Sequence, residues 1–164
     1  MQRFSRIFTS SLLLIATLVS LASSSTPSIT SPSNGTSINP GDKFTFSYHS
    51  IADYGTSSYN YTVWLFTTPP SAFVPFKDYA SGYYFGRYAS PNYPGNPNPS
   101  NPPPATLTMP NFARLRRGVG SGSHARNATV YLAVLEEYIT GESLGYRISL
   151  VYNHIFYNGT YVVH

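Results

Sequence analysis

The sequence predicts an all-β fold, namely an antiparallel β-sandwich of about seven strands. Three observations predict it. Apolar and polar residues alternate with a period of two, β-branched and aromatic residues dominate the alternating runs, and glycine, proline and asparagine separate these runs. Aromatic residues make up 16% of the chain, which supplies large side chains for a core. The length of 164 residues fits one domain.

The N-terminal segment predicts a secretory signal peptide over residues 1–22. Two arginines precede the apolar run LLLIATLVSL, and Ser20 and Ala22 are placed as the small residues of a cleavage site. The run is shorter than the about 20 apolar residues of a transmembrane helix, which disfavours a signal anchor. We therefore expect a mature single domain over residues 23–164 with no membrane anchor.

The composition of the mature chain excludes several classes of function. Without the two arginines of the signal peptide, the formal net charge falls from +4 to +2, so no strongly basic face for nucleic acid is expected. Cysteine is absent, which excludes catalytic thiols, zinc–thiolate sites and disulfides. The core must therefore be stabilised by burial and hydrogen bonding alone.

Four N-x-[ST] sequons predict N-glycosylation. They lie at Asn34, Asn60, Asn127 and Asn158, whereas proline disqualifies Asn98-Pro-Ser. Four sequons behind a signal peptide indicate a eukaryotic secretory route. The chain ends in TYVVH without an apolar tail, so we do not expect a GPI anchor.

The first predicted elements lie in the stretch ITSPSNGTSINPGDKFTFSY, which begins at Ile29. We expect an edge strand, then turns at Asn34-Gly35 and Pro40-Gly41, and then a core strand. In that core strand Phe44, Phe46 and Tyr48 point to one face. The five clearest strand predictions are residues 43–49, 58–67, 105–109, 128–139 and 146–157.

Two of these runs carry further expectations. Residues 128–139 are apolar at both parities up to Glu136, which predicts a central strand covered on both faces, with a helix as the alternative. In residues 146–157, Tyr146 and Tyr152 lie on the same face. Asn158-Gly159 between apolar runs predicts a C-terminal hairpin.

Two regions predict long loops. Residues 69–104 carry most of the prolines and are rich in tyrosine, so we expect an exposed polyproline-like segment that joins no central ladder. Residues 111–126 combine arginines with a glycine-serine run, which predicts a flexible loop. The strand number and turn chemistry together favour a sandwich of immunoglobulin or fibronectin type III character, with a barrel as the alternative.

The opening stretch also carries a resemblance to a known group of proteins. Ser31-Pro32-x-Asn34-Gly35-Thr36, followed by Pro40-Gly41 and an alternating strand, resembles the start of fungal small secreted Ig-like proteins. It is distantly similar to the Ig-like domain of Ser/Thr-rich fungal cell-wall proteins linked to β-1,6-glucan assembly. The resemblance covers residues 28–68 and includes the strand YNYTVW. It implies a cell-wall or extracellular setting and no catalytic residues, whereas the missing Ser/Thr-rich stalk argues against covalent wall anchoring.

Catalytic machinery is sparse in the sequence. Glu136 and Glu137 are consecutive and would face opposite sides of a strand, although Glu137 and Glu142 could meet across a turn. No G-x-S-x-G motif occurs, and the run GVGSGS lacks the Gly-Lys-[Ser/Thr] ending of a phosphate loop. No two histidines have the spacing of local metal ligands. We expect no enzyme, no metal and no cofactor, and a small hydrolase is the least favoured alternative.

Two groups of residues are candidates for binding. The basic group is a solvated loop, a docking patch for anionic polysaccharide or phospholipid headgroups, or a dibasic processing site. It comprises Arg114, Arg116, Arg117 and Arg126. The aromatic group offers rigid, amphipathic contact area, or simply covers one sheet. It comprises Trp64, Tyr79, Tyr83, Tyr84, Tyr88 and Tyr93.

The orientation of Trp64 bears on whether the aromatic group is a binding surface or simply covers a sheet. If Asn60 carries a glycan, Trp64 shares its outward face, while Tyr59 and Tyr61 face the core. A bulge, or an Asn60 without a glycan, would instead return Trp64 to the core. We therefore expect a secreted, non-enzymatic protein with a structural or interaction role, or alternatively a lectin-like module. The expected partner is a cell-wall polysaccharide or another extracellular protein.

Overall fold

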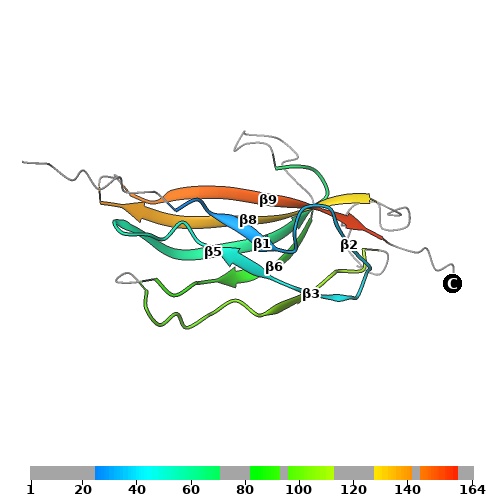
Figure 1. Ribbon diagram of the computed structural model, residues 1–164, viewed down its shortest axis with the longest axis horizontal. Coiled ribbons are helices and arrows are strands. Elements are labelled where there is room, and N and C mark those ends of the chain that lie inside the picture. Colours follow the sequence, from blue (N-terminus) through cyan, green and yellow to red (C-terminus); the bar gives the residue numbers. More distant parts are fainter. Residues whose placement is uncertain (1–24, 71–81, 93–95, 113–127, 142–144, 159–164) are drawn as a thin grey trace, which may run out of the picture.

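The computed structural model describes residues 25–70, 82–92, 96–112, 128–141 and 145–158 (Figure 1). Within these ranges the protein is all-β, as predicted, and contains no helix, hence none that could cross a membrane. The described part holds nine strands, two more than expected. They are β1 (Ser28–Ser31), β2 (Thr36–Ile38), β3 (Lys43–Thr45), β4 (Ser47–His49), β5 (Thr56–Phe66), β6 (Gly82–Tyr88), β7 (Thr106–Thr108), β8 (Ala128–Thr140) and β9 (Arg147–Tyr157).

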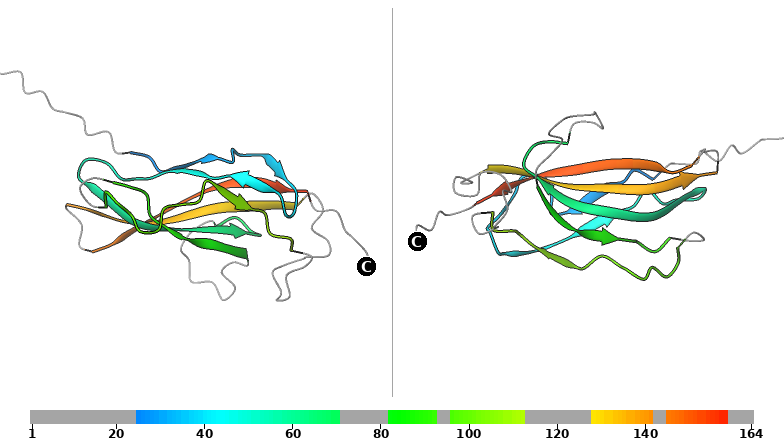
Figure 2. Two further views of the ribbon diagram at one scale, coloured as in Figure 1. Left: turned by 90° about the horizontal axis from the view of Figure 1, so that it is seen from below. Right: turned by 180° about the vertical axis from the view of Figure 1, so that it is seen from behind.

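Five strands form one sheet in the order β2-β9-β8-β5-β6. Its long strands β9, β8, β5 and β6 lie side by side in the view from behind (Figure 2). β8 is hydrogen-bonded on both sides, to β5 and to β9, which explains why its sequence is apolar at both parities. The helix alternative for residues 128–139 was wrong.

One pairing in this sheet corrects the all-antiparallel prediction. β2 runs parallel to β9, with Thr36 opposite Ile155. After β1 the chain passes through a cis Ser31–Pro32 peptide and the Asn34-Gly35 turn, and Gly35 donates its N–H to the carbonyl of His154 at 2.9 Å. This turn moves the chain from β4, the antiparallel partner of β1, to the edge of the five-stranded sheet. The direction of β2 follows from that change of partner.

The remaining strands form two small sheets, β1-β4 and β3-β7. β3 and β4 are consecutive parts of the predicted strand 43–49, and Phe46 between them donates its N–H to the carbonyl of Ala105. Phe44 and Phe46 are buried, and Tyr48 on the same predicted face packs against the core, as predicted. Residues from the five-stranded sheet and from both small sheets form one core. The core comprises Ile29, Ile38, Phe44, Phe46, Tyr61, Val63, Leu65, Leu107, Met109, Phe112, Val130, Leu132, Val134, Ile155 and Tyr157.

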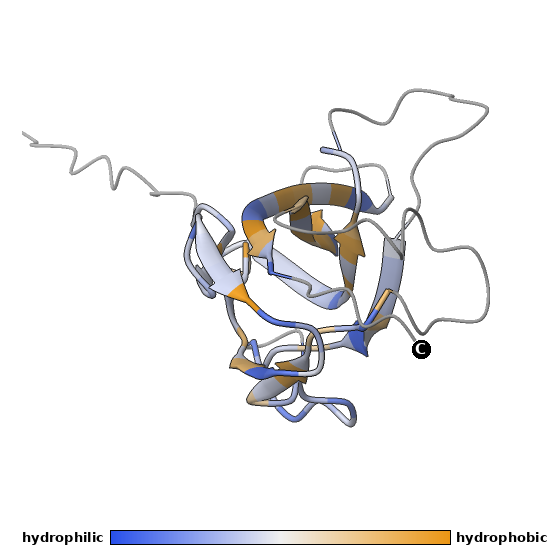
Figure 3. Ribbon diagram, turned by 90° about the vertical axis from the view of Figure 1, so that its right-hand side faces the viewer, coloured by the Kyte–Doolittle hydropathy of each residue, from blue (hydrophilic) through white to orange (hydrophobic). Residues whose placement is uncertain are grey.

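Figure 3 views the strands end-on and shows them arranged around this core. Asn153 of β9 ties the N-terminal segment to the sheet, because its Nδ2 donates to the carbonyls of Ile29 and Pro32 at 3.0 and 2.9 Å. A bulge between Ser58 and Asn60 places Ser58 and Tyr61 on the same inner face. The prediction that Tyr59 faces the core was therefore wrong.

β6 corrects the prediction of an uninterrupted loop over residues 69–104. Its sequence GYYFGRY is aromatic and carries no proline, so it pairs with β5 as an edge strand. Three predicted features fall outside the described residues, in part or in whole. These are the rest of that loop at 71–81 and 93–95, most of the loop 111–126, and the C-terminal hairpin beyond Asn158.

Candidate functional site

Glu136 lies on the inner face of β8 and is 0% exposed. Its Oε1 accepts hydrogen bonds from the hydroxyls of Ser50 and Ser58, both at 2.5 Å. Its Oε2 accepts from the Tyr48 hydroxyl at 2.5 Å and from the Ile51 N–H at 3.0 Å. Both carboxylate oxygens are thus engaged by donors from the chain itself. This arrangement holds the segment after β4 against β5 and β8.

Two phenols beside this carboxylate titrate far from neutrality. Burial raises the pKa of Tyr61 to about 12, and the negative charge of Glu136 adds to the effect. Burial, followed by the hydrogen bond to Glu136, raises the pKa of Tyr48 well above its usual value. Both groups therefore remain protonated at physiological pH, and Tyr48 can act as a donor to the carboxylate.

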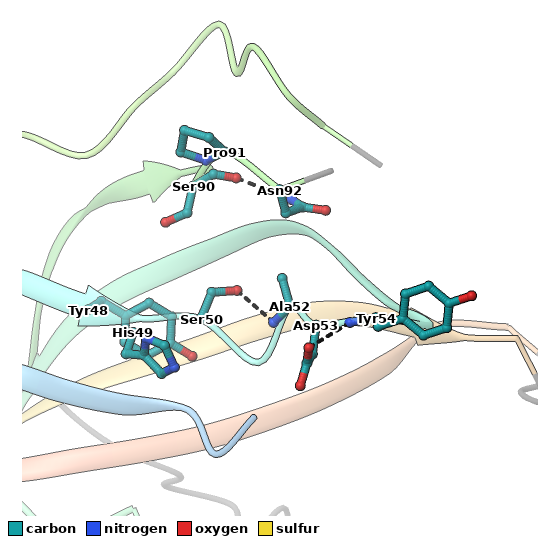
Figure 4. Close-up of a pocket in the computed structure, with 9 residues that line it drawn as sticks. All are labelled: Tyr48, His49, Ser50, Ala52, Asp53, Tyr54, Ser90, Pro91 and Asn92. Atoms are coloured by element: carbon teal, nitrogen blue, oxygen red, sulfur yellow. Dashed lines mark hydrogen bonds between the residues drawn. The ribbon is translucent and has the colours of Figure 1, made fainter. Parts of the chain in front are cut away.

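A pocket of about 410 Å³ opens next to this cluster. In Figure 4, Ser90, Pro91 and Asn92 face the segment 48–54 across it. Asn92 is held by its Nδ2, which donates to the carbonyls of Ser58 and Ser90. Asp53 is the one carboxylate among the lining residues, and its Oδ1 accepts the Tyr54 N–H at 2.7 Å. Among the described residues that line this pocket, the carboxyl pair that a glycosidase uses is therefore missing.

The other candidate for acid–base chemistry is engaged elsewhere. Glu137 faces outward and forms an ion pair with Arg87 of β6 at 2.6 Å. Its proposed partner Glu142 lies outside the described residues. Among the residues that the structure describes, no group of three or more His, Cys, Asp or Glu side chains is placed to hold a metal ion.

The outer face of the five-stranded sheet carries most of the exposed rings. Beyond the bulge, β5 alternates regularly, with Tyr61, Val63 and Leu65 buried inward. Trp64 therefore lies on the outer face and is half-buried there, so the core alternative was wrong. The bulge lies before Tyr61, so the alternation from Tyr61 to Leu65 is unbroken and Trp64 keeps its outward position.

A row of cross-strand neighbours runs through Trp64. The register pairs Trp64 with Tyr84 of β6 and with Ala133 of β8, and pairs Ala133 with Tyr152 of β9. The Trp64 and Tyr84 rings lie 4.6 Å apart between centroids. Ala133 is 0% exposed although it faces outward, because larger side chains surround it. At about 4.8 Å per strand, the row from Tyr84 to Tyr152 spans roughly 14 Å.

A second set of rings lies beside this row. Phe66 stacks on Trp64 with 5.8 Å between ring centroids and 8° between planes, and its cross-strand neighbour is Tyr131. Tyr131 in turn contacts Tyr152 edge to face at 5.8 Å. We call these rings the aromatic face; Tyr84, Tyr152 and Phe156 in it are between 42% and 46% exposed. The aromatic face comprises Trp64, Phe66, Tyr84, Tyr131, Tyr152 and Phe156.

Polar groups border the aromatic face on one side. Thr62 lies next to Trp64 on the outer face and pairs across the ladder with Arg87. Arg87 and Glu137 neutralise each other there, so the border offers hydrogen-bonding groups with little net charge. Asn60, opposite Glu137, lies one position further along the same outer face.

The structure brings together only part of the aromatic group predicted from sequence. Trp64 and Tyr84 are neighbours on the outer face, whereas Tyr83 and Tyr88 pack against the core. Tyr79 and Tyr93 lie outside the described residues. Sequence reasoning missed the other members of the aromatic face. Those on β8 and β9 occupy alternate positions in 128–139 and 146–157. The sequence did not show which set of alternate positions faces outward, because both sets carry apolar residues.

The sequons and the basic group are placed as follows. Asn34 and Asn158 are exposed, and Asn60 is partly exposed on the outer face. Asn34 accepts the His154 N–H through its Oδ1 at 2.9 Å, which leaves its Nδ2 available for a glycan. The sequon at Asn127 and the basic group lie outside the described residues. The basic group is Arg114, Arg116, Arg117 and Arg126.

Comparison with known proteins gives no relative for this chain. No model of a known protein family matches it, and neither a curated protein nor a solved structure gives a match.

Proposed function

We propose that the protein is a secreted, N-glycosylated, non-enzymatic module that binds polysaccharide through its aromatic face. The observation that carries this proposal is the row Tyr84–Trp64–Ala133–Tyr152, in which Tyr84 and Tyr152 are 46% and 43% exposed. The ring of Phe66 is 7% exposed and supports Trp64 by stacking on it. Sugar rings present apolar C–H faces that pack on aromatic rings, while their hydroxyls bond to polar groups at the border. The aromatic face offers both kinds of group on one sheet.

The finer fold assignment belongs to the same proposal. We infer an immunoglobulin-like sandwich, in which β5, β8 and β9 form the central part of one sheet and β6 is an additional strand beside β5, as in variable-type domains. The sheet order and the pairing of the N-terminal segment with both layers support this inference. The outward position of Trp64 and the lack of a disulfide depart from the antibody pattern.

The polysaccharide is proposed to be a neutral one from a cell wall. The described polar border holds a compensated ion pair between Arg87 and Glu137 instead of an excess of one charge. The resemblance of residues 28–68 to fungal secreted Ig-like proteins supports a cell-wall setting. Among the described residues that line the pocket, Asp53 is the one carboxylate, whereas a glycosidase uses a pair, which supports binding without hydrolysis.

A second candidate function is binding of another extracellular protein by the same face. Ile148 of β9 supports it, because this side chain is 55% exposed and lies on the outer face beyond the aromatic rings. Exposed aliphatic side chains next to aromatic ones are typical of protein interfaces.

Retention of the secreted protein on insoluble chitin, β-glucan and cellulose tests the main proposal. We expect retention on at least one of them and a loss of about tenfold in affinity for Trp64→Ala, which corresponds to about 1.4 kcal/mol. Trp64 is the single tryptophan of the chain, so added soluble oligosaccharide should also change its fluorescence.

Tyr54→Ala is the matched control for this experiment. Tyr54 is 99% exposed but lies in the turn before β5 and not on the aromatic face, so its removal should leave retention unchanged. Equal losses for both variants, or no retention on any of the three polymers, would contradict polysaccharide binding. Capture of a defined extracellular protein that depends on Ile148 would favour the second candidate.

A further inference from the structure

The position of Asn60 distinguishes it from the two other described sequons. Asn60 lies within β5, which has β6 on one side and β8 on the other. Asn34 lies in the turn before the edge strand β2, and Asn158 follows the end of β9. A glycan on either of these can extend away from the sheet. A glycan on Asn60 starts from the outer face itself, beside the last cross-strand pairs of β6, so the neighbouring rings of that face lie within its reach.

The direction of β5 places the aromatic face within reach of this glycan. Asn60, Thr62 and Trp64 follow one another on the outer face, so Trp64 lies four residues, or about 13 Å, from the attachment point. The first two sugars of an N-glycan are β-linked N-acetylglucosamine rings, which can cover such a distance. Arg87 lies on β6 and Glu137 on β8, so their ion pair crosses β5 between Asn60 and Trp64 and can bond to the hydroxyls of sugars packed over it.

We propose that the N-glycan on Asn60 packs on the aromatic face and acts as a tethered competitor of the external polysaccharide. The packing of the glycan rests on the proposed secretion and glycosylation, and its role as a competitor also rests on the proposed polysaccharide binding. A tethered ligand has an effective concentration in the millimolar range, so it can occupy a site of modest affinity almost completely. The fraction of molecules that carry a glycan on Asn60 then determines the fraction whose aromatic face is open to an external ligand. The ligand class of the face is β-linked N-acetylglucosamine.

Two variants remove this glycan by different changes. Asn60→Gln removes the attachment site, and Thr62→Val removes the sequon while Asn60 stays. In both variants we expect about tenfold tighter binding of chitotriose than in the glycosylated wild type, because the competitor is lost. The fluorescence of Trp64 should also become more accessible to a collisional quencher. Asn158→Gln, which removes a glycan beyond the end of the sheet, should change neither quantity.

Removal of the glycans from folded, purified wild-type protein covers the case in which a variant fails to fold. An amidase that cleaves the glycan from asparagine should increase quenching of Trp64 as Asn60→Gln does. The inference is overturned if mass spectrometry finds Asn60 unmodified in the secreted protein. It is also overturned if quenching is the same with and without the glycan.

These outcomes separate the inference from the proposed function. If chitotriose binding depends on Trp64 but not on the Asn60 glycan, the tethered competitor is disproved and polysaccharide binding stands. If no glycoform binds any polysaccharide, while removal of the glycan still uncovers Trp64, the proposed function fails. In that case the packing of the glycan on the aromatic face stands.

Discussion

Glu136 shows how a buried charge is accommodated without a cation among its hydrogen-bond partners. Two hydroxyls approach one of its oxygens, and a phenol and a backbone N–H approach the other. A buried carboxylate is costly unless its lone pairs are satisfied, and charge-assisted hydrogen bonds are about twice as strong as neutral ones. These four bonds also connect the segment after β4 to β5 and β8. The residue is therefore a structural anchor between the segment after β4 and the five-stranded sheet.

Replacement of this carboxylate should be costly. In Glu136→Gln, an NH₂ group replaces one carboxylate oxygen and faces groups that donate hydrogen bonds in the wild type. Of these groups, the backbone N–H of Ile51 cannot become an acceptor. We expect a loss of about 2–4 kcal/mol in the free energy of unfolding, measured by urea denaturation.

Glu137→Gln is the control for that measurement. It removes only the ion pair with Arg87 at the surface, which should contribute less than about 1 kcal/mol. Similar losses for the two variants would show that Glu136 is not an anchor.

Single residues were only partly predictable from sequence. The opposite orientation of Glu136 and Glu137 was predicted from their consecutive positions on a strand, and the structure confirms it. Which of the two faces inward was not predictable, because the strand is apolar at both parities. Tyr59 was misplaced because the bulge between Ser58 and Asn60 inserts one residue, and no sequence pattern marks it.

At the level of elements, β6 depends on close backbone contact with β5. Gly82 begins this strand opposite Phe66, and a Cβ at Gly82 would collide with the backbone carbonyl of Leu65. Gly86 has a φ of 153°, which favours glycine, and it lies next to the register shift in the ladder. The two glycines allow an aromatic edge strand to approach β5.

Gly82→Ala should therefore destabilise the edge of the sheet. Because the obstacle is backbone and not a flexible side chain, β6 must shift, and we expect a loss of about 1–3 kcal/mol in unfolding free energy. In this variant the backbone amides of β6 should exchange their hydrogens faster than in the wild type, with a larger increase than in β9. Gly141→Ala is the control, because nothing lies within 4 Å of a Cβ there. An unchanged exchange rate in β6 would contradict this account.

The long strands β5, β8 and β9 could be predicted, as could the short strands within 43–49 and 105–109, whereas β2 and β6 could not. β5, β8 and β9 have 11 to 13 residues, which is long enough for the alternation to be clear. β6 was hidden by the prolines that follow it, although its own sequence has a typical strand composition. β2 has three residues, too few to indicate its partner or direction. The parallel pairing is decided by tertiary packing at the sheet edge.

At the level of the whole molecule, the stability of the folded protein depends on buried tyrosine hydroxyls that stay protonated. Burial raises the pKa of Tyr48, Tyr61, Tyr88 and Tyr157 above that of a free phenol. Tyr48 belongs to the small sheet β1-β4, and the other three belong to the five-stranded sheet. Ionisation of a phenol in the unfolded chain, but not in the folded one, favours unfolding.

Stability should therefore fall at alkaline pH. Below pH 10 each phenol is protonated in both states, so this contribution is constant. Above pH 10 the unfolded chain loses protons that the folded chain keeps, and each such phenol lowers the unfolding free energy by at most about 1.4 kcal/mol per pH unit. For Tyr61 the loss continues to about pH 12. Urea denaturation from pH 8 to 11 measures it.

Tyr61→Phe provides the comparison for the alkaline experiment. This variant lacks one phenol with a raised pKa, so its stability should decline less steeply above pH 10 than that of the wild type. A wild-type stability that is constant up to pH 11 would show that the buried phenols ionise equally in both states.

The parallel ladder between β2 and β9 has a consequence for biosynthesis. It joins Thr36 to Ile155, which are 119 positions apart, so β2 has no partner on this sheet until β9 has been made. Contacts between such distant segments close large loops and slow folding. The sheet edge at β2 is thus completed last, after the ribosome has released β9. A chain truncated before β9 would expose the open side of β8, whose unpaired backbone groups favour aggregation.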